Sequence, residues 1–182
     1  MKKTLTFLVV GLMLFSACDE ESDANPSGTE TPSLNGVWEL ASFDATAAVA
    51  ITGVTLTYDV EASNMDYALT TNDGTYSTAG SYDIKVSRRG APDSLAENQS
   101  ITNIAESGTY THTDKSVTSS KNFVGLTVEG IDFSGISGSE TANYSFNNAG
   151  QLELTSTFDV DTVISFGAAN IAVVSNTVWN KK

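Results

Sequence analysis

Few side chains of this 182-residue chain could carry out a reaction. His112 is its single histidine and Cys18 its single cysteine, so neither a cluster of His and Cys metal ligands nor a nucleophile–base pair is evident. Asp159 and Asp161 would share one side of a strand, but the other ligands of a calcium loop are missing. No glycine-rich segment between a strand and a helix predicts a phosphate-binding loop. The sequence therefore predicts no enzyme, no metal and no cofactor.

A cluster of basic residues is the local feature that most favours ligand binding. Lys85, Arg88 and Arg89 lie close together at the start of the longest polar loop, Ser87–Gln99. Because a guanidinium binds carboxylate or phosphate in a fork, we predict that Arg88 and Arg89 attract an anionic headgroup to this loop. The alternative is a solvated turn whose charges offset nearby acidic residues.

His112 is the other polar candidate. It follows Tyr110 with one residue between, so both would share one face of a strand. There His112 would place a polar group inside a cavity, or it would be a hydrogen-bonded strand residue with no further role. The sequence leaves both interpretations open.

The elements that would position these residues are strands. From Leu34 onward apolar and polar residues alternate with period 2, which indicates antiparallel sheet with one buried side. The clearest segments are Val54–Val60, Ser81–Val86, Thr141–Asn147 and Gln151–Val160. The residues expected to face inward are Trp38, Leu40, Val54, Leu56, Tyr58, Tyr67, Leu69, Tyr82, Ile84, Tyr110, Leu126, Val128, Phe133, Tyr144, Phe146, Leu152, Leu154, Phe158, Ile164 and Phe166.

Turn residues divide these strands. Asn72-Asp73-Gly74 and Asn147–Gly150 predict tight hairpins, and Thr113–Ser116 and Glu129-Gly130 indicate further turns. Only Pro92–Asn98 favours helix, for one or two turns. Short strands joined by short turns predict an all-β domain, built as an antiparallel up-and-down β-barrel or alternatively as a two-sheet β-sandwich.

The N-terminus has the organisation of an exported lipoprotein. Lys2 and Lys3 precede the apolar stretch Leu5–Phe15, which has the length of a signal-peptide core and is too short to span a bilayer. Phe15-Ser16-Ala17-Cys18 then supplies small residues before a cut and a thiol to receive a diacylglyceryl group. We predict that residues 1–17 are a lipoprotein signal peptide, and that acyl chains on Cys18 hold the protein in a membrane.

Residues 18–33 are acidic, contain proline and predict a disordered tether. The acidic run after Cys18 resembles the export signal of some Gram-negative lipoproteins, which implies the outer membrane and exposure at the cell surface. In other bacteria an acidic residue such as Asp19 at the second mature position instead retains a lipoprotein in the inner membrane.

Net charge narrows the range of partners. The chain has 9 basic and 22 acidic residues. Removal of Lys2 and Lys3 with the signal peptide leaves 7 basic and 22 acidic residues, a net charge of −15. Such a surface repels phosphate backbones, so we expect no nucleic-acid partner.

A family resemblance begins directly after the tether. Gly36-Val37-Trp38 resembles the Gly-x-Trp start of lipocalin-like domains, in which the tryptophan begins the first strand and plugs one end of a barrel. Asp73-Gly74-Thr75-Tyr76 and Ser107-Gly108-Thr109-Tyr110 are similar to strand starts of lipocalin-like lipoproteins. The resemblance implies a lipocalin-like β-barrel over residues 34–182. In that family a basic residue of the last strand packs over the tryptophan, and here the first basic residue after Asn170 is Lys181.

This resemblance implies a barrel that binds a small hydrophobic or amphipathic ligand. The predicted ligand-binding residues are Trp38, Tyr58, Tyr82, Tyr110, His112, Arg88 and Arg89. The alternative is a protein-interaction module with a filled core, such as a protease inhibitor or an accessory subunit of an outer-membrane assembly.

Overall fold

The computed structural model describes residues 33–124, 127–128, 131–132, 140–164 and 167–182. The predictions for the signal peptide, Cys18 and residues 18–32 lie outside the described residues, as do those for Leu126, Phe133 and Phe166 and for the turn at 129–130. The side chains of Val128 and Ile164, predicted to face inward, also lie outside what the structure describes. No described segment forms a helix of the length and apolarity that crossing a membrane would require.

Strands make up nearly all of the described chain. The only helical element among these residues is one 3₁₀ turn, η1 (Asp93–Leu95), which is shorter than the predicted Pro92–Asn98 helix. The strands are β1 (Gly36–Ile51), β2 (Val54–Asn72), β3 (Thr75–Arg88), β4 (Glu97–His112), β5 (Ser116–Ser119), β6 (Thr127–Val128), β7 (Ile131–Asp132), β8 (Glu140–Phe146), β9 (Leu152–Ile164) and β10 (Gly167–Lys181).

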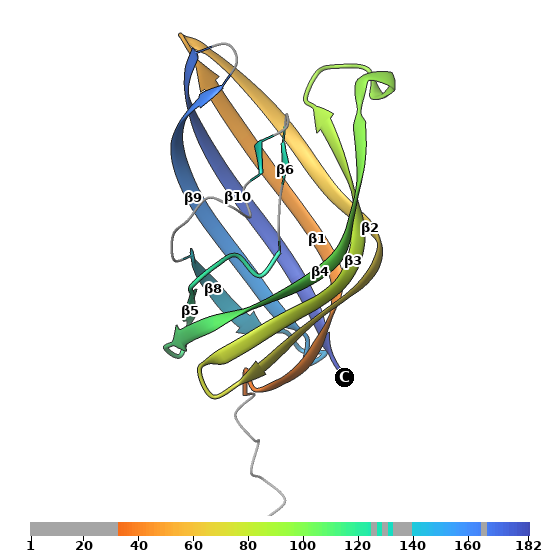
Figure 1. The fold of residues 1–182 in the computed structure, drawn as a ribbon, viewed down its shortest axis with the longest axis vertical. Helices are drawn as coiled ribbons and strands as arrows, with labels where there is room; N and C mark the ends of the chain where they lie inside the picture. Colours follow the sequence, from red (N-terminus) through yellow and green to blue (C-terminus); the bar gives the residue numbers. More distant parts are fainter. Residues whose placement is uncertain (1–32, 125–126, 129–130, 133–139, 165–166) are drawn as a thin grey trace, which may run out of the picture. The chain divides into compact units, whose positions relative to one another are not determined.

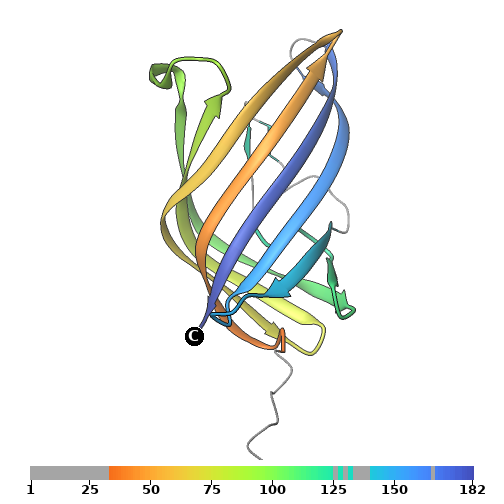
Figure 2. The same cartoon turned by 180° about the vertical axis from the view of Figure 1, so that it is seen from behind.

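Eight of these strands form one ring of antiparallel neighbours in the order β1-β2-β3-β4-β5-β8-β9-β10 (Figure 1). The ring closes because β1 also pairs with β10, from Trp38 opposite Lys181 to Ile51 opposite Ala169. Figure 2 shows β1, β10 and β9 side by side along one wall. The all-β, up-and-down prediction is confirmed at this level. A single ring replaces the alternative of two facing sheets, because every neighbouring pair belongs to one hydrogen-bonded sheet.

The two ends of the ring carry different residues. We call one the tryptophan end, since it holds Trp38, Trp179 and the turns that join β2 to β3, β4 to β5 and β8 to β9. The other is the arginine end, which holds the β1–β2 turn and the segment between Arg88 and Glu97. The chain enters the described domain at the tryptophan end.

Two neighbours in the ring are short. β5 pairs with only three residues of β4, Tyr110 to His112, and with four residues of β8. Residues 97–109 of β4 therefore have a ladder partner on the β3 side alone, among the residues that the structure describes. β6 and β7 pair with each other as a two-stranded hairpin.

Alternation along the strands builds the core, and bulges shift its phase. On β1 the register shifts between Leu40 and Ser42, so the inward face passes from even-numbered residues such as Trp38 to odd-numbered ones such as Phe43. The alternation analysis missed the inward residues beyond this bulge, Phe43, Ala45, Ala47 and Val49, all of which are buried.

Most of the predicted inward residues are buried or packed against the core where the structure describes them. Val54 is the exception, with 59% of its surface exposed, so its predicted place inside was wrong. It pairs with Ile51 across the tip of the β1–β2 hairpin, beyond the end of β3, so no neighbouring strand covers it.

The turn predictions hold wherever the structure describes them. Asn72-Asp73-Gly74 joins β2 to β3, Thr113–Ser116 joins β4 to β5, and Asn147–Gly150 joins β8 to β9. The polar loop Ser87–Gln99 is shorter than predicted, because β3 continues through Arg88 and β4 begins at Glu97.

The two Gly-Thr-Tyr segments lie side by side. Thr75 pairs with Thr109 and Tyr76 with Gly108, and the amide of Tyr110 donates to the carbonyl of Gly74 at 2.8 Å. A Cβ on Gly108 would be 2.8 Å from the Tyr76 ring, so the missing side chain makes room for that ring.

Candidate functional site: a pocket at the arginine end

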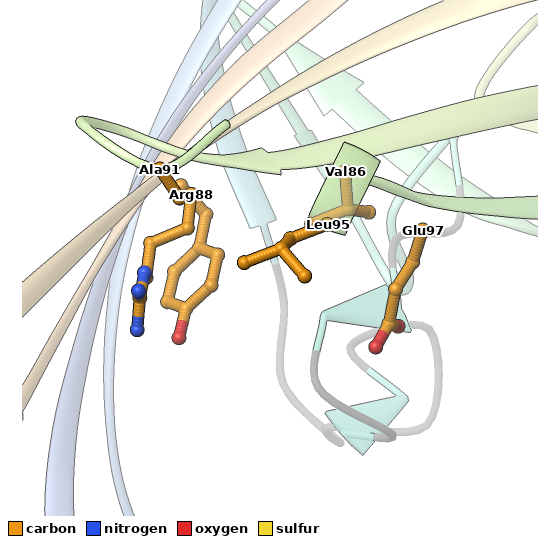
Figure 3. A pocket seen from close by; sticks show the side chains of 6 residues that line it. Val86, Arg88, Ala91, Leu95 and Glu97 are labelled. Carbon is orange, nitrogen blue, oxygen red and sulfur yellow. The ribbon is translucent and has the colours of Figure 1, made fainter. Parts of the chain in front are cut away.

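A pocket of about 150 Å³ opens where β3 ends and β4 begins, at the arginine end (Figure 3). Alternate residues of a strand face the same side of the sheet, and on β3 the buried side holds Tyr82, Ile84 and Val86. Arg88, the last residue of β3, continues this inward face. Across the ladder Arg88 pairs with Tyr58 and Val86 pairs with Glu97. The lining residues are Tyr58, Val86, Arg88, Ala91, Leu95 and Glu97.

The pocket combines an apolar floor with charged ends. Val86 and the ring of Tyr58 are buried, whereas Leu95 of η1 is 65% exposed at the lip. Tyr58 lies opposite Arg88 in the ladder, and in Figure 3 Leu95 lies between Arg88 and Glu97. An apolar group placed here would cover Leu95, which solvent otherwise surrounds.

Arg88 and Arg89 have different surroundings. The Nε and Nη2 atoms of Arg89 donate to the two carboxylate oxygens of Asp59 at 3.1 and 2.5 Å, and this hydrogen-bonded cation lowers the pKa of the Asp59 carboxyl. Arg88 makes no ion pair with any residue that the structure describes. Arg88 therefore has a guanidinium free to bind an anion, while the Arg89 charge is already paired.

A shallow groove lies beside the pocket at the edge of β2. It is open to solvent, has a volume of about 480 Å³ and is lined by Thr55, Leu56, Thr57, Arg88, Arg89 and Gly90. The Arg89 amide donates to the Thr57 carbonyl at 2.8 Å and fixes the chain at this corner. Arg88 is thus shared by the groove and the pocket.

Deeper inside the ring the polar groups are tied to the framework. The Tyr67 hydroxyl donates to the Phe123 carbonyl at 2.6 Å, and burial raises its pKa to about 12. Burial also raises the pKa of Glu140, which faces inward on β8. The rings of Tyr67 and Tyr82 pack edge to face at 5.2 Å, so Tyr82 contributes to the packed core.

The tryptophan end is tightly packed. The indole N–H of Trp38 donates to the Leu34 carbonyl at 2.8 Å, and the Thr71 hydroxyl donates to the same oxygen. The space between Leu34, Tyr110 and their neighbours is about 10 Å³, no more than the minimum for one water. No ligand fits between these described side chains.

Lys181 packs over Trp38 at this end. Its Nζ lies 5.4 Å from the centre of the indole ring, within the range of a cation–π contact. Lys181 is directly opposite Trp38 on β10 and continues the inward face of Thr177 and Trp179, which places its side chain on the side of the sheet that holds Trp38.

The structure separates the predicted ligand-binding residues into groups. Tyr58 and Arg88 meet in the pocket, and Arg89 stands beside it. Trp38, Tyr82 and Tyr110 are buried, with the Tyr110 hydroxyl donating to the Asn35 side-chain oxygen at 3.0 Å. The ring of His112 lies 6.0 Å from that of Tyr110, so the two share one face of β4 as predicted, but His112 is exposed beside the β4–β5 turn, where Nδ1 lies 3.3 Å from the Thr113 carbonyl.

Glu97 and Leu95 are pocket residues that sequence reasoning missed. Their signal was weak, because both lie in what the sequence marks as a polar loop. Once β3 is extended through Arg88, the pairing of Val86 with Glu97 places them both next to the basic cluster.

Comparison with known proteins gives no further indication of function. No family model, no curated protein and no solved structure matches this chain.

Proposed function

We propose that this protein is a membrane-anchored lipoprotein whose lipocalin-like barrel binds a small hydrophobic or amphipathic ligand at the arginine end. The observation that carries the proposal is the pocket itself, which joins apolar walls to one guanidinium that lacks an ion pair among the described residues. Mostly apolar concave sites with a few polar groups are the usual form of small-molecule sites.

Arg88 is the residue that holds the ligand headgroup. Its guanidinium offers a fork of donors that fits a carboxylate, and Tyr58, opposite it on β2, lines the same pocket. The hydrocarbon part of the ligand then packs on Val86, Ala91 and Leu95. The guanidinium of Arg89 adds positive charge near the pocket but stays hydrogen-bonded to the carboxylate of Asp59.

The lipocalin-like assignment is supported by the tryptophan end. Trp38 plugs that end with 1% of its surface exposed, and a basic residue of the last strand, Lys181, packs over it. Both features are those that the Gly-x-Trp resemblance implies.

An anchor on Cys18 is compatible with ligand access. The tether would join the domain at Leu34, at the opposite end from the pocket. A fully extended segment from Cys18 to Ser33 reaches at most about 55 Å, so the arginine end can face away from a membrane.

The test compares an anionic amphiphile with a neutral one of the same length. We expect octanoate to bind the purified protein several-fold more tightly than octanol. Arg88→Gln removes this preference, because the variant keeps the pocket's size and loses its charge. Arg89→Gln is the matched control and keeps the preference. Equal loss in both variants, or no loss in either, contradicts the assignment of Arg88 as the headgroup residue.

A protein-interaction module is the second candidate, and one observation favours it. Residues 97–109 of β4 have no strand partner on their second side among the described residues, and such an edge can add a strand from another chain. A partner bound there would slow amide hydrogen exchange along β4 without changing ligand affinity at Arg88.

A further inference from the structure

The pocket at the arginine end carries two opposite charges, not one. Glu97 lines it together with Arg88, and neither residue makes an ion pair with any part of the chain that the structure describes. In Figure 3 the two side chains stand at opposite sides of Leu95. A carboxylate that lines the pocket without an ion pair favours a ligand that also carries a positive charge.

The ladder fixes the separation of the two backbone positions. Glu97 is directly opposite Val86, and Arg88 is two residues further along β3. Two residues of strand rise about 7 Å and neighbouring strands are about 5 Å apart, so the two backbone positions are on the order of 8 Å apart. The long side chains of Arg and Glu can span that backbone distance. The two residues nevertheless form no ion pair among the described residues, and Figure 3 shows Leu95 between them.

We propose that this pocket binds a small zwitterion that carries its carboxylate and its ammonium at opposite ends of a short apolar chain. The carboxylate binds Arg88, the ammonium binds Glu97, and the chain packs on Val86 and Leu95. This inference rests on the proposed ligand-binding function and names the ligand class of the same site. It differs from a plain fatty anion in requiring Glu97.

The volume limits the ligand to a small molecule. A cavity of about 150 Å³ is the size that holds roughly a benzene ring, or about six carbon atoms. Five methylene groups between two charged ends fit this volume, and the long side chains of Arg88 and Glu97 reach toward the two charges. Leu95, exposed at the lip, would be covered by such a chain.

The experiment uses calorimetric titration of the purified mature protein, in mild detergent, with three probes of equal length. These are 6-aminohexanoate, hexanoate and hexylamine. We expect 6-aminohexanoate to bind about tenfold more tightly than either probe with one charge. Norleucine, with both charges on one carbon, binds more weakly than 6-aminohexanoate.

Single substitutions assign each charge. Glu97→Gln makes 6-aminohexanoate and hexanoate bind equally, and Arg88→Gln makes 6-aminohexanoate and hexylamine bind equally. The matched controls, Arg89→Gln and Glu61→Gln, change the net charge by the same amount at residues outside the pocket and leave both preferences intact. Exchanging the charges with Arg88→Glu and Glu97→Arg together restores 6-aminohexanoate binding, because the ligand can reverse.

The outcomes separate this inference from the proposed function. Hexanoate binding as tightly as 6-aminohexanoate overturns the zwitterion and leaves an anionic amphiphile on Arg88. Failure of all three probes, with octanoate still bound through Arg88, also overturns the zwitterion alone. Failure of octanoate in the separate test removes the proposed function itself.

Discussion

Among the described glycines, Gly80 is the one where an added methyl group should most reduce the stability of the ring of strands. Gly80 has φ +128°, a conformation that L side chains rarely adopt. It lies opposite Tyr67, next to the register shifts between Ser63 and Asp66 on β2 and between Gly80 and Tyr82 on β3. A Cβ built on Gly80 would overlap the Asp66 carbonyl oxygen and lie 2.9 Å from the Tyr67 Cα. The glycine therefore permits the close approach of two bulged strands.

The expected cost of Gly80→Ala combines two terms. Backbone strain at this φ costs about 1–3 kcal/mol. The overlap must also push β2 away and weaken at least one ladder hydrogen bond, at about 1 kcal/mol each. We expect a loss of about 2–4 kcal/mol in the free energy of unfolding, which is a large part of the roughly 5–15 kcal/mol of a typical domain.

The assay is denaturant unfolding followed by tryptophan fluorescence, since Trp38 and Trp179 are both buried. Gly150→Ala is the matched control, because Gly150 has φ +75° and nothing within 4 Å of an added Cβ. We expect that variant to lose only about 1–2 kcal/mol, the cost of the left-handed backbone. If Gly80→Ala is no more destabilising than Gly150→Ala, the close approach of β2 and β3 is refuted.

Three further predictions concern individual side chains. Because burial raises the pKa of Tyr67 to about 12 against an ordinary value of 10.0, its phenol should stay protonated in the folded protein well above pH 10. The contribution of this raised pKa to the free energy of unfolding is fully present below pH 10 and is lost as the pH rises from 10 to 12. Tyr67→Phe should therefore flatten the curve of unfolding free energy against pH between 10 and 12. An unchanged curve would contradict the assignment. Lys181→Gln should lower the free energy of unfolding by about 0.5–1 kcal/mol, because the contact with Trp38 is lost, and should shift the fluorescence of Trp38. Lys182→Gln loses only an exposed ion pair with Glu39 and should leave the Trp38 fluorescence unchanged. Arg89→Gln should raise the pKa of Asp59, measured by NMR titration, toward its ordinary value, while Arg88→Gln should not; an equal effect of both variants would show that Arg88 also contacts Asp59.

The hairpins and the inward faces of most strands could be predicted, because alternation and turn residues are local signals. Asn72-Asp73-Gly74 has the chemistry of a tight turn, and Tyr82 and Ile84 follow one parity without interruption. The second half of β1 could not be predicted in the same way. The bulge after Leu40 changes the parity, and only pairing with β10 and β2 reveals it.

The candidate site shows the same division between local and long-range information. The basic cluster at Arg88 and Arg89 was visible from composition, but its two members differ only through a partner 30 residues away, Asp59. Glu97 became a site residue through its pairing with Val86. Lys181 continues the inward parity of Thr177 and Trp179, which is a local signal, but only the pairing of β1 with β10 shows that its partner is Trp38.

The central claim is that this domain carries a small ligand. Native mass spectrometry of the protein purified gently from its own host tests it most directly. The account predicts a copurified small molecule that is released on denaturation, with a mass that identifies its class, and reduced occupancy in Arg88→Gln but not in Arg89→Gln. A bare mass for the folded wild-type protein would contradict the account and would direct the search to protein partners.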